Sequence, residues 1–171
     1  MELGNFDMDT NHSSWLQSET EQILTFSLND EEYGVNILMV NEIREWSNIT
    51  TIPGIANYVK GVLHLRSNIV PIIDLREKFG LDPIPYGPTT VVILLNIVNN
   101  NTQNVIGIVV DSVSDTHAVN HKDIREKPSV GGFIDVAYIQ GLVEVDERLV
   151  LLLDVNKLLS ESQIEQLQAA I

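Results

Sequence analysis

The sequence predicts an all-β protein built from two copies of one small unit, and three observations support this fold class. From Gln22 onward, short runs of Val, Ile and Leu alternate with turn residues, which is typical of strands joined by hairpins. A stretch of the chain recurs 80 residues further on without a gap, so that Gly61–Leu75 aligns with Gly141–Val155. Apolar residues make up 44% of the 171 positions, which is enough to fill the interior of two such units.

The chain divides into a polar tail, a double β unit and a terminal helix. The N-terminal residues are polar and acidic, and we expect a flexible tail that is neither a secretion signal nor a membrane anchor. Near the C-terminus, Ser162 followed by Glu165 forms a capping-box pattern that predicts a short helix. The predicted boundaries are 1–20 for the tail, 21–160 for the β domain with repeats near 22–80 and 89–160, and 161–171 for the helix.

Each half of the β domain begins with a predicted hairpin. In the first half, Ile23–Leu28 and Tyr33–Ile37 are β-type runs joined by a short turn of Asn, Asp and Glu residues. In the second half, Val91–Leu95 and Val105–Val110 are strongly β-branched, and the polar run Asn99–Asn104 between them predicts the hairpin loop.

The repeated stretch predicts a second hairpin in each half, followed by a helical turn. Its second strand is a continuous apolar run, Ile69–Ile73 or Leu149–Leu153, which suits a strand buried on both faces. Asp74 and Asp154 end these runs, and we expect each to cap a helical turn by accepting a backbone N–H. Pro71 lacks an N–H donor and therefore predicts a sheet edge or a bulge.

The two copies differ in charge at the turn of this hairpin. The first copy has His64 and Arg66 where the second has Glu144 and Asp146. A requirement of the fold would act on both copies alike, so Arg66 is a candidate contact residue. An ordinary surface arginine is equally consistent with this observation.

Composition narrows the classes of partner. The net charge of −14 disfavours nucleic acid and anionic membrane surfaces, although the same acidity also serves solubility alone. The chain has no cysteine, which excludes disulfides and thiolate sites. No stretch reaches the roughly 18–20 apolar residues that span a bilayer, so we expect a cytoplasmic protein without membrane insertion.

Enzyme and metal sites have little support in the sequence. His117 and His121 with Asp115 could bind a metal, but their segment is predicted to be a loop after a strand, and no further ligand is evident. The carboxylates of Glu31–Glu32 and Asp82 fall in turns, whereas acid–base catalysis needs a pair held in a cleft. No phosphate-binding loop, nucleophile elbow or dinucleotide fingerprint is present. We expect no catalytic residue, metal or cofactor, and a small-ligand-binding β-barrel is the rival class.

Three ordered segments resemble the signatures of the CheW family. Asp30–Arg44 resembles the first signature, Lys60–Arg66 followed by Ile69–Arg76 the second, and Gly107–Asp115 the third. The resemblance extends from about Gln22 to the C-terminal helix, and three motifs with compatible spacing make it specific.

The resemblance implies a fold and a function. The family fold is two five-stranded SH3-like barrels that are partly swapped, or intertwined, and its members are adaptors that join chemoreceptor tips to the regulatory domain of the CheA histidine kinase. The same module occurs within CheA and CheV proteins, but no kinase, phosphotransfer or receiver region is evident here, so we expect a free-standing coupling protein. It would be recruited to membrane-associated chemoreceptor arrays. An adaptor of a non-flagellar chemosensory pathway is the alternative.

The resemblance also assigns site residues. In the family, the receptor tip binds between the barrels, where apolar side chains grip it and charged ones such as Glu42 and Arg66 set its register. Barrel core is the alternative location for the aliphatic members of this set. A contact with the kinase falls on Ile69 at a barrel end. The implied receptor-binding residues are Val40, Glu42, Ile43, Arg66 and Val113.

Three positions depart from the family pattern. The family has Asn-Leu-Arg-Gly where this chain has His64–Ser67, and serine in place of glycine argues against a positive φ in that turn. His64 is expected to be a surface side chain. Thr116 replaces an apolar residue at the end of the third signature, which predicts a different edge of the receptor site.

Overall fold

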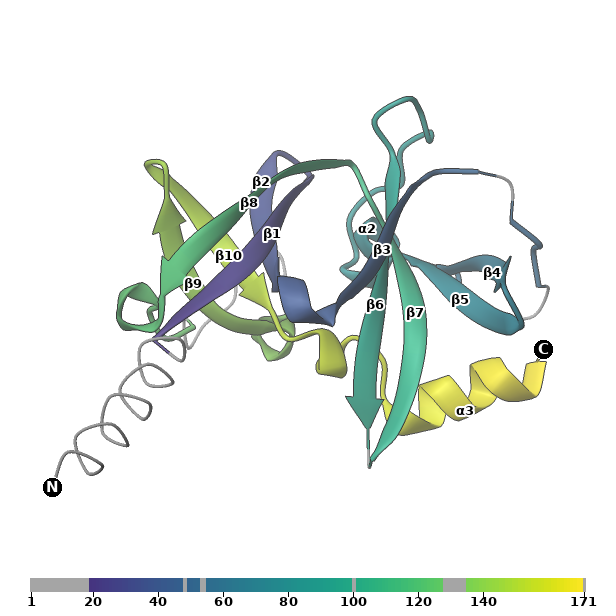
Figure 1. The fold of residues 1–171 in the computed structure, drawn as a ribbon. Helices are drawn as coiled ribbons and strands as arrows, with labels where there is room; N and C mark the ends of the chain where they lie inside the picture. The colour runs from purple at the N-terminus through teal and green to yellow at the C-terminus, as the bar shows by residue number, and fades with distance from the viewer. Residues whose placement is uncertain (1–18, 48, 53–54, 100, 128–134, 171) are drawn as a thin grey trace, which may run out of the picture.

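The structure is a computed structural model that describes residues 19–47, 49–52, 55–99, 101–127 and 135–170 (Figure 1). Within these ranges it is mostly β, with two five-stranded sheets and a short C-terminal helix, so the predicted fold class is confirmed. The strands are β1 (Thr20–Leu28), β2 (Glu31–Asn36), β3 (Val40–Glu45), β4 (Val59–Leu65), β5 (Asn68–Asp74), β6 (Val91–Asn99), β7 (Thr102–Val110), β8 (Ser112–Asn120), β9 (Ile139–Val145) and β10 (Arg148–Leu153). The helices are α2 (Leu75–Lys78) and α3 (Glu161–Ala170), and the 3₁₀ turns are η1 (Ile37–Met39), η2 (His121–Asp123), η3 (Val136–Tyr138) and η4 (Val155–Lys157).

The two sheets exchange strands between the halves of the chain. Sheet A has the order β8-β1-β2-β10-β9, and sheet B has the order β3-β6-β7-β5-β4. The first half therefore contributes β1 and β2 to sheet A and β3 to β5 to sheet B, while the second half does the reverse. In Figure 1 the purple and yellow-green strands lie together in one unit, and the blue and teal strands lie together in the other. Neither unit can form from one repeat alone.

The two copies of the 80-residue repeat pair in the same way with strands from the other half of the chain. Each sheet contains one parallel pair, β2 with β10 or β5 with β7, in which a glycine is the partner of an aliphatic residue. Gly34 pairs with Leu152, and Gly107 pairs with Ile72, which occupies the position equivalent to Leu152 in the repeat. A Cβ built on Gly107 would lie 2.5 Å from the Ile72 Cδ1 atom. These glycines make room for the aliphatic side chains against which the exchanged strands pack.

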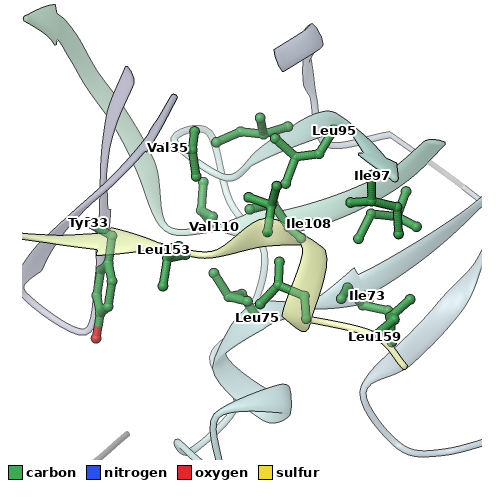
Figure 2. Packing of buried hydrophobic residues seen from close by; sticks show 14 of the residues in the cluster. Tyr33, Val35, Ile73, Leu75, Leu95, Ile97, Ile108, Val110, Leu153 and Leu159 are labelled. Atoms are coloured by element: carbon green, nitrogen blue, oxygen red, sulfur yellow. The ribbon is translucent and has the colours of Figure 1, made fainter. Parts of the chain in front are cut away.

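The main hydrophobic core crosses from one sheet to the other. Figure 2 shows Tyr33 and Leu153 of sheet A on the same cluster as Ile108 of sheet B. Smaller clusters lie within each sheet separately. Because the largest cluster draws on both sheets, burial of apolar surface stabilises the two units jointly.

Pro71 lies in an interior strand, so the prediction of an edge is wrong. β5 lies between β7 and β4 in sheet B, and no register shift occurs at Pro71. The pairing of β5 with β7 covers only residues 72–74 of β5. The proline therefore precedes that pairing, where its missing N–H leaves no ladder bond unmade.

The two aspartates that end the repeated strands behave differently. The buried Asp74 carboxylate accepts a hydrogen bond from the Glu77 backbone N–H at 3.3 Å, which confirms the predicted cap. Asp154 makes no side-chain capping bond, so the same prediction is wrong for the second copy. Asp74 begins an α-helical turn, whereas Asp154 precedes the 3₁₀ turn η4.

Asp74 also holds the segment that precedes β6. Its second carboxylate oxygen accepts a hydrogen bond from the Tyr86 hydroxyl at 2.5 Å, and the Tyr86 ring packs against Trp46 with 4.2 Å between ring centroids. Burial, followed by this hydrogen bond to Asp74, raises the pKa of Tyr86 well above its usual range. Burial and the nearby Glu31 raise the pKa of Tyr33 in the same direction.

These tyrosines predict a loss of stability at alkaline pH. A phenol whose pKa is higher in the folded chain stabilises the fold fully below about pH 10 and loses that contribution as the pH rises further. We expect the free energy of unfolding to fall above about pH 10, and Tyr86→Phe to reduce that dependence while costing about 1–3 kcal/mol at neutral pH. Denaturant titrations across this pH range, compared with Tyr33→Phe, measure both effects. A flat profile for the unsubstituted chain would contradict the prediction.

Candidate functional site

Strands β3 and β8 carry four of the five residues implied to bind receptors. β3 is an edge strand of sheet B, and β8 is an edge strand of sheet A. Val40 on β3 and Val113 on β8 are half-buried and pack against the same shared core cluster. The structure therefore brings these two valines, which come from different sheets, onto one core. The sequence left barrel core and receptor contact as alternatives for these valines. In the structure, each side chain is partly buried in the core and partly exposed at the surface.

Glu42 and Ile43 lie on β3 but point to opposite faces, since adjacent strand residues alternate. Ile43 is 43% exposed, whereas Glu42 is half-buried and lies 4.0 Å from the Arg44 guanidinium. An ion pair at this distance and exposure contributes little to stability, so Glu42 can exchange Arg44 for a cation of a partner at small cost.

Arg66 lies on a different element, where it is exposed at the turn between β4 and β5. β3 and β4 are the two edge strands of sheet B, and Thr50, in the segment after β3, exchanges backbone hydrogen bonds with Val62 of β4. Its φ of 56° shows that the turn does have a left-handed residue, at Arg66 and not at Ser67. The second copy has two such residues, Asp146 and Glu147, as in a type I′ hairpin. The expectation of no positive φ in this turn therefore fails at Arg66, while Ser67 itself has none.

The other departures from the family pattern fall on the surface. His64 is exposed on β4, as expected, and pairs with Ile69 of β5. Thr116 is exposed on β8, where its backbone N–H donates to the Asp115 carboxylate at 2.7 Å. A polar side chain at position 116 therefore changes the surface of β8 without placing an unsatisfied group in the core.

Each sheet has an exposed aliphatic residue at an equivalent end. Ile69 at the start of β5 is 40% exposed, and Leu149 at the start of β10 is 53% exposed. The prediction that the runs 69–73 and 149–153 are buried throughout is therefore wrong at their first residues, and their third residues, Pro71 and Leu151, are only half-buried. Leu149 was not among the predicted site residues. Its position in the repeat is equivalent to that of Ile69, and this equivalence is a signal that could have identified it.

A further exposed leucine lies beside β3. Leu38 in η1 is 83% exposed, and its backbone N–H donates to the Asn36 side chain at 2.9 Å. This bond closes the 3₁₀ turn that links sheet A to sheet B and holds Leu38 outside the core. Sequence reasoning missed it, because an isoleucine-leucine-methionine run gives no sign of which residue is exposed.

Two charged residues of the predicted signatures meet inside the molecule. Arg76 and Asp111 form an ion pair with 2.7 Å between Nη1 and Oδ2. The sequence offered a signal for Arg76, since the second copy has Asn156 at the equivalent position.

The metal and membrane alternatives gain no support from the structure. His117 lies within β8, not in a loop as predicted, and His121 lies in η2, where its Nε2 atom is 3.7 Å from the Glu21 carboxylate. Among the residues that the structure describes, no group of three or more His, Cys, Asp or Glu side chains could hold a metal ion. In the same part of the chain, no helix is long and apolar enough to cross a membrane.

Comparisons with known proteins agree on one family. The model of the CheW-like domain matches residues 22–163. The chemotaxis protein CheW of Klebsiella aerogenes is 42% identical over 153 residues, which cover 88% of this chain and 90% of that protein. CheW of Treponema pallidum is 31% identical over 89% of each chain.

A solved structure agrees as well. The crystal structure of the scaffolding protein CheW from Thermoanaerobacter tengcongensis superposes with a TM-score of 0.74 at 28% identity, covering 81% of this chain and 91% of that one. The chain therefore belongs to the CheW family of chemotaxis proteins, non-catalytic scaffolds that couple receptors to the CheA kinase.

Proposed function

We propose that this chain holds a chemoreceptor tip against the surface formed by β3 and β8 and holds a CheA-type kinase at a barrel end. The observation that carries the proposal is the placement of Val40 and Val113, which come from edge strands of different sheets and pack on one core. A partner bound across both strands contacts both sheets at once. The protein acts in the cytoplasm and joins membrane-associated receptor arrays through these contacts.

The receptor surface combines aliphatic and charged side chains. Leu38 and Ile43 are exposed on either side of Val40 along the chain, and they offer apolar contacts to a helical hairpin. Glu42 adds a charge whose present partner is weakly held. Arg66, at the turn between β4 and β5, supplies a second charge that limits how a long receptor tip can be oriented.

The kinase surface is proposed at the exposed aliphatic residues of the barrel ends. Ile69 and Leu149 are equivalent in the repeat, so the protein has two related ends, one on each sheet. The regulatory domain of CheA has the same module by the resemblance described above, so docking of one barrel end on another is a self-consistent arrangement. Small contacts of this kind gain strength when many copies assemble.

Charge reversal at Arg66 tests the receptor contact. Arg66→Glu should weaken receptor binding and receptor control of the kinase by on the order of tenfold, because it turns an attraction into a repulsion. The fold should remain intact, since the equivalent position already holds Asp146. Co-sedimentation with receptor-containing membranes and purified kinase measures binding, and kinase phosphorylation measures control.

A matched control is the reversal of the equivalent residue in the second copy. Asp146→Arg changes the same kind of turn on sheet A and should leave receptor binding close to that of the unsubstituted chain. Full receptor control in Arg66→Glu would show that Arg66 is not a contact. An unsubstituted chain that co-sediments with neither partner, or that binds a small ligand instead, would contradict the coupling function itself. Pull-down from a lysate distinguishes a flagellar from a non-flagellar pathway by the receptors recovered.

A further inference from the structure

Arg76 is a buried arginine at the junction of the two sheets. Its exposed fraction is 8%, and it lies in α2, directly after β5 of sheet B. Each of its three guanidinium nitrogens donates a hydrogen bond. Nη1 donates to the Asp111 carboxylate at 2.7 Å, Nε to the Asp82 backbone carbonyl at 2.8 Å, and Nη2 to the Asn29 side-chain oxygen at 3.3 Å.

Two of these three partners belong to the elements of sheet A. Asn29 lies in the turn between β1 and β2, and Asp111 is the single residue between β7 of sheet B and β8 of sheet A. Asp111 is bound from both sides, because its carboxylate also accepts the Asn29 backbone N–H at 2.9 Å and its own N–H donates to the Ser27 carbonyl at 3.1 Å. The residue at which the chain changes sheets is thus held by sheet A and by Arg76 together.

The repeat shows that a helical turn can follow the repeated strand without an arginine at this position. The second copy has Asn156 at the equivalent position, and its side chain accepts the backbone N–H of Val98 instead. Arg76 is therefore specific to the first copy, the copy in which the helical turn faces the crossing point between the sheets. A planar guanidinium with several fixed donors holds such a crossing in one geometry better than a flexible ammonium would.

We infer that Arg76 is a positioning residue: through Asp111 it fixes where β8, and with it Val113, lies relative to β3. The inference rests on the proposed receptor surface for its functional consequence. Val113 lies two residues after Asp111, on the strand that begins there, so a change at Asp111 is transmitted directly along β8. Without the Arg76 contact, the β7–β8 crossing keeps its bonds to sheet A and loses its tie to α2 of sheet B.

The absence of cysteine makes a direct geometric test possible. Spin labels on cysteines introduced at Glu45 of β3 and Ala118 of β8, both exposed, report the distance between the two strands by pulsed electron paramagnetic resonance. We expect one narrow distance distribution in the parent chain. Arg76→Gln should broaden or shift that distribution. Arg76→Lys keeps the positive charge but loses the planar guanidinium with its several donors, so it should have a smaller effect.

Receptor and kinase binding form the second readout. In Arg76→Gln we expect receptor affinity to fall on the order of tenfold. Kinase affinity should change less than about twofold, because neither Ile69 of β5 nor Leu149 of β10 lies on β7 or β8, the strands that the crossing joins. A purely structural role would lower both affinities together with the folded fraction. Arg148→Gln is the matched control, since it removes an ion pair to Glu32 within sheet A and should leave the distance unchanged.

Asp111→Asn keeps the shape of the side chain and removes its charge, so it serves if Arg76→Gln does not fold. An unchanged distance distribution in a folded Arg76→Gln or Asp111→Asn variant would overturn the inference, whatever the receptor affinity. A changed distribution with unchanged receptor affinity would support the positioning role and would instead show that the proposed receptor surface is wrong.

Discussion

The Gly61→Ala variant is expected to lose about 3–5 kcal/mol of folding free energy, a large part of the stability of a domain this size. A Cβ built on Gly61 would lie 2.1 Å from the carbonyl oxygen of Thr50. The obstacle is backbone, and it is fixed by a pair of hydrogen bonds between Thr50 and Val62. The φ of Gly61, 149°, is also one that side chains rarely adopt. Neither the clash nor the strain can be relieved by rotating a side chain.

Substitutions of two other glycines serve as controls for Gly61→Ala. Gly87 has open space around its Cβ position and no positive φ, so Gly87→Ala should change stability by less than about 1 kcal/mol. Gly141 is the equivalent of Gly61 in the second copy, with the Arg125 carbonyl oxygen 2.9 Å from its Cβ position, so Gly141→Ala should cost an intermediate amount. Urea denaturation followed by circular dichroism gives the three values. A loss below about 1 kcal/mol for Gly61→Ala would contradict the proposed close approach.

Phe26→Ala is expected to destabilise both sheets together by about 3–5 kcal/mol. Phe26 is fully buried on β1 of sheet A and stacks on Tyr33 with 5.8 Å between ring centroids. Both residues belong to the cluster that continues into sheet B. The cavity left by the phenyl ring therefore removes contacts from a core that the two sheets share.

The sequence provides a natural probe of this coupling. Trp46 follows β3 of sheet B and packs on Tyr86, so its fluorescence reports unfolding of sheet B. With the other tryptophan replaced in a Trp15→Phe background, Phe26→Ala should shift the Trp46 transition and the circular dichroism transition to the same lower midpoint. If Trp46 kept its original midpoint while a second transition emerged, the two sheets would be independent folding units.

Local patterns in the sequence were reliable wherever neighbouring residues decide the structure. The hairpins that turn at Asn29 and Asn101 follow from β-type runs separated by residues that tolerate a positive φ. Both asparagines have a positive φ in the structure. The gapless repeat placed β4, β5, β9 and β10 at matching positions. These features depend on short-range sterics and on alternation, which a sequence displays directly.

Features that depend on distant contacts were less predictable. Pro71 predicted an edge, yet β5 is an interior strand. The proline is tolerated there because the parallel pairing of β5 with β7 begins only at Ile72. Asp154 matched Asp74 in the alignment but makes no side-chain capping bond. Ile69 and Leu149 belong to apolar runs that predicted full burial. Only the folded structure shows that both side chains are exposed.

The candidate site shows the same division. The resemblance assigned Val40, Glu42, Ile43, Arg66 and Val113 by motif position, and the structure places four of them on β3 and β8 and Arg66 in the turn between β4 and β5. Arg76 and Asp111 were visible in the motifs, but an arginine and an aspartate 35 positions apart give no sign that they form a partly buried ion pair.

The sequence by itself determined the all-β class, the duplication and the family resemblance, because repetition and strand periodicity are properties of neighbouring residues and of their order. Only the tertiary structure decided which strands exchange, which valines lie at the junction of the sheets, and what Arg76 holds. Pairing such as β2 with β10 joins residues more than 100 positions apart, as between Gly34 and Leu152. Its free energy comes from burial and hydrogen bonds that exist only when the whole chain is folded.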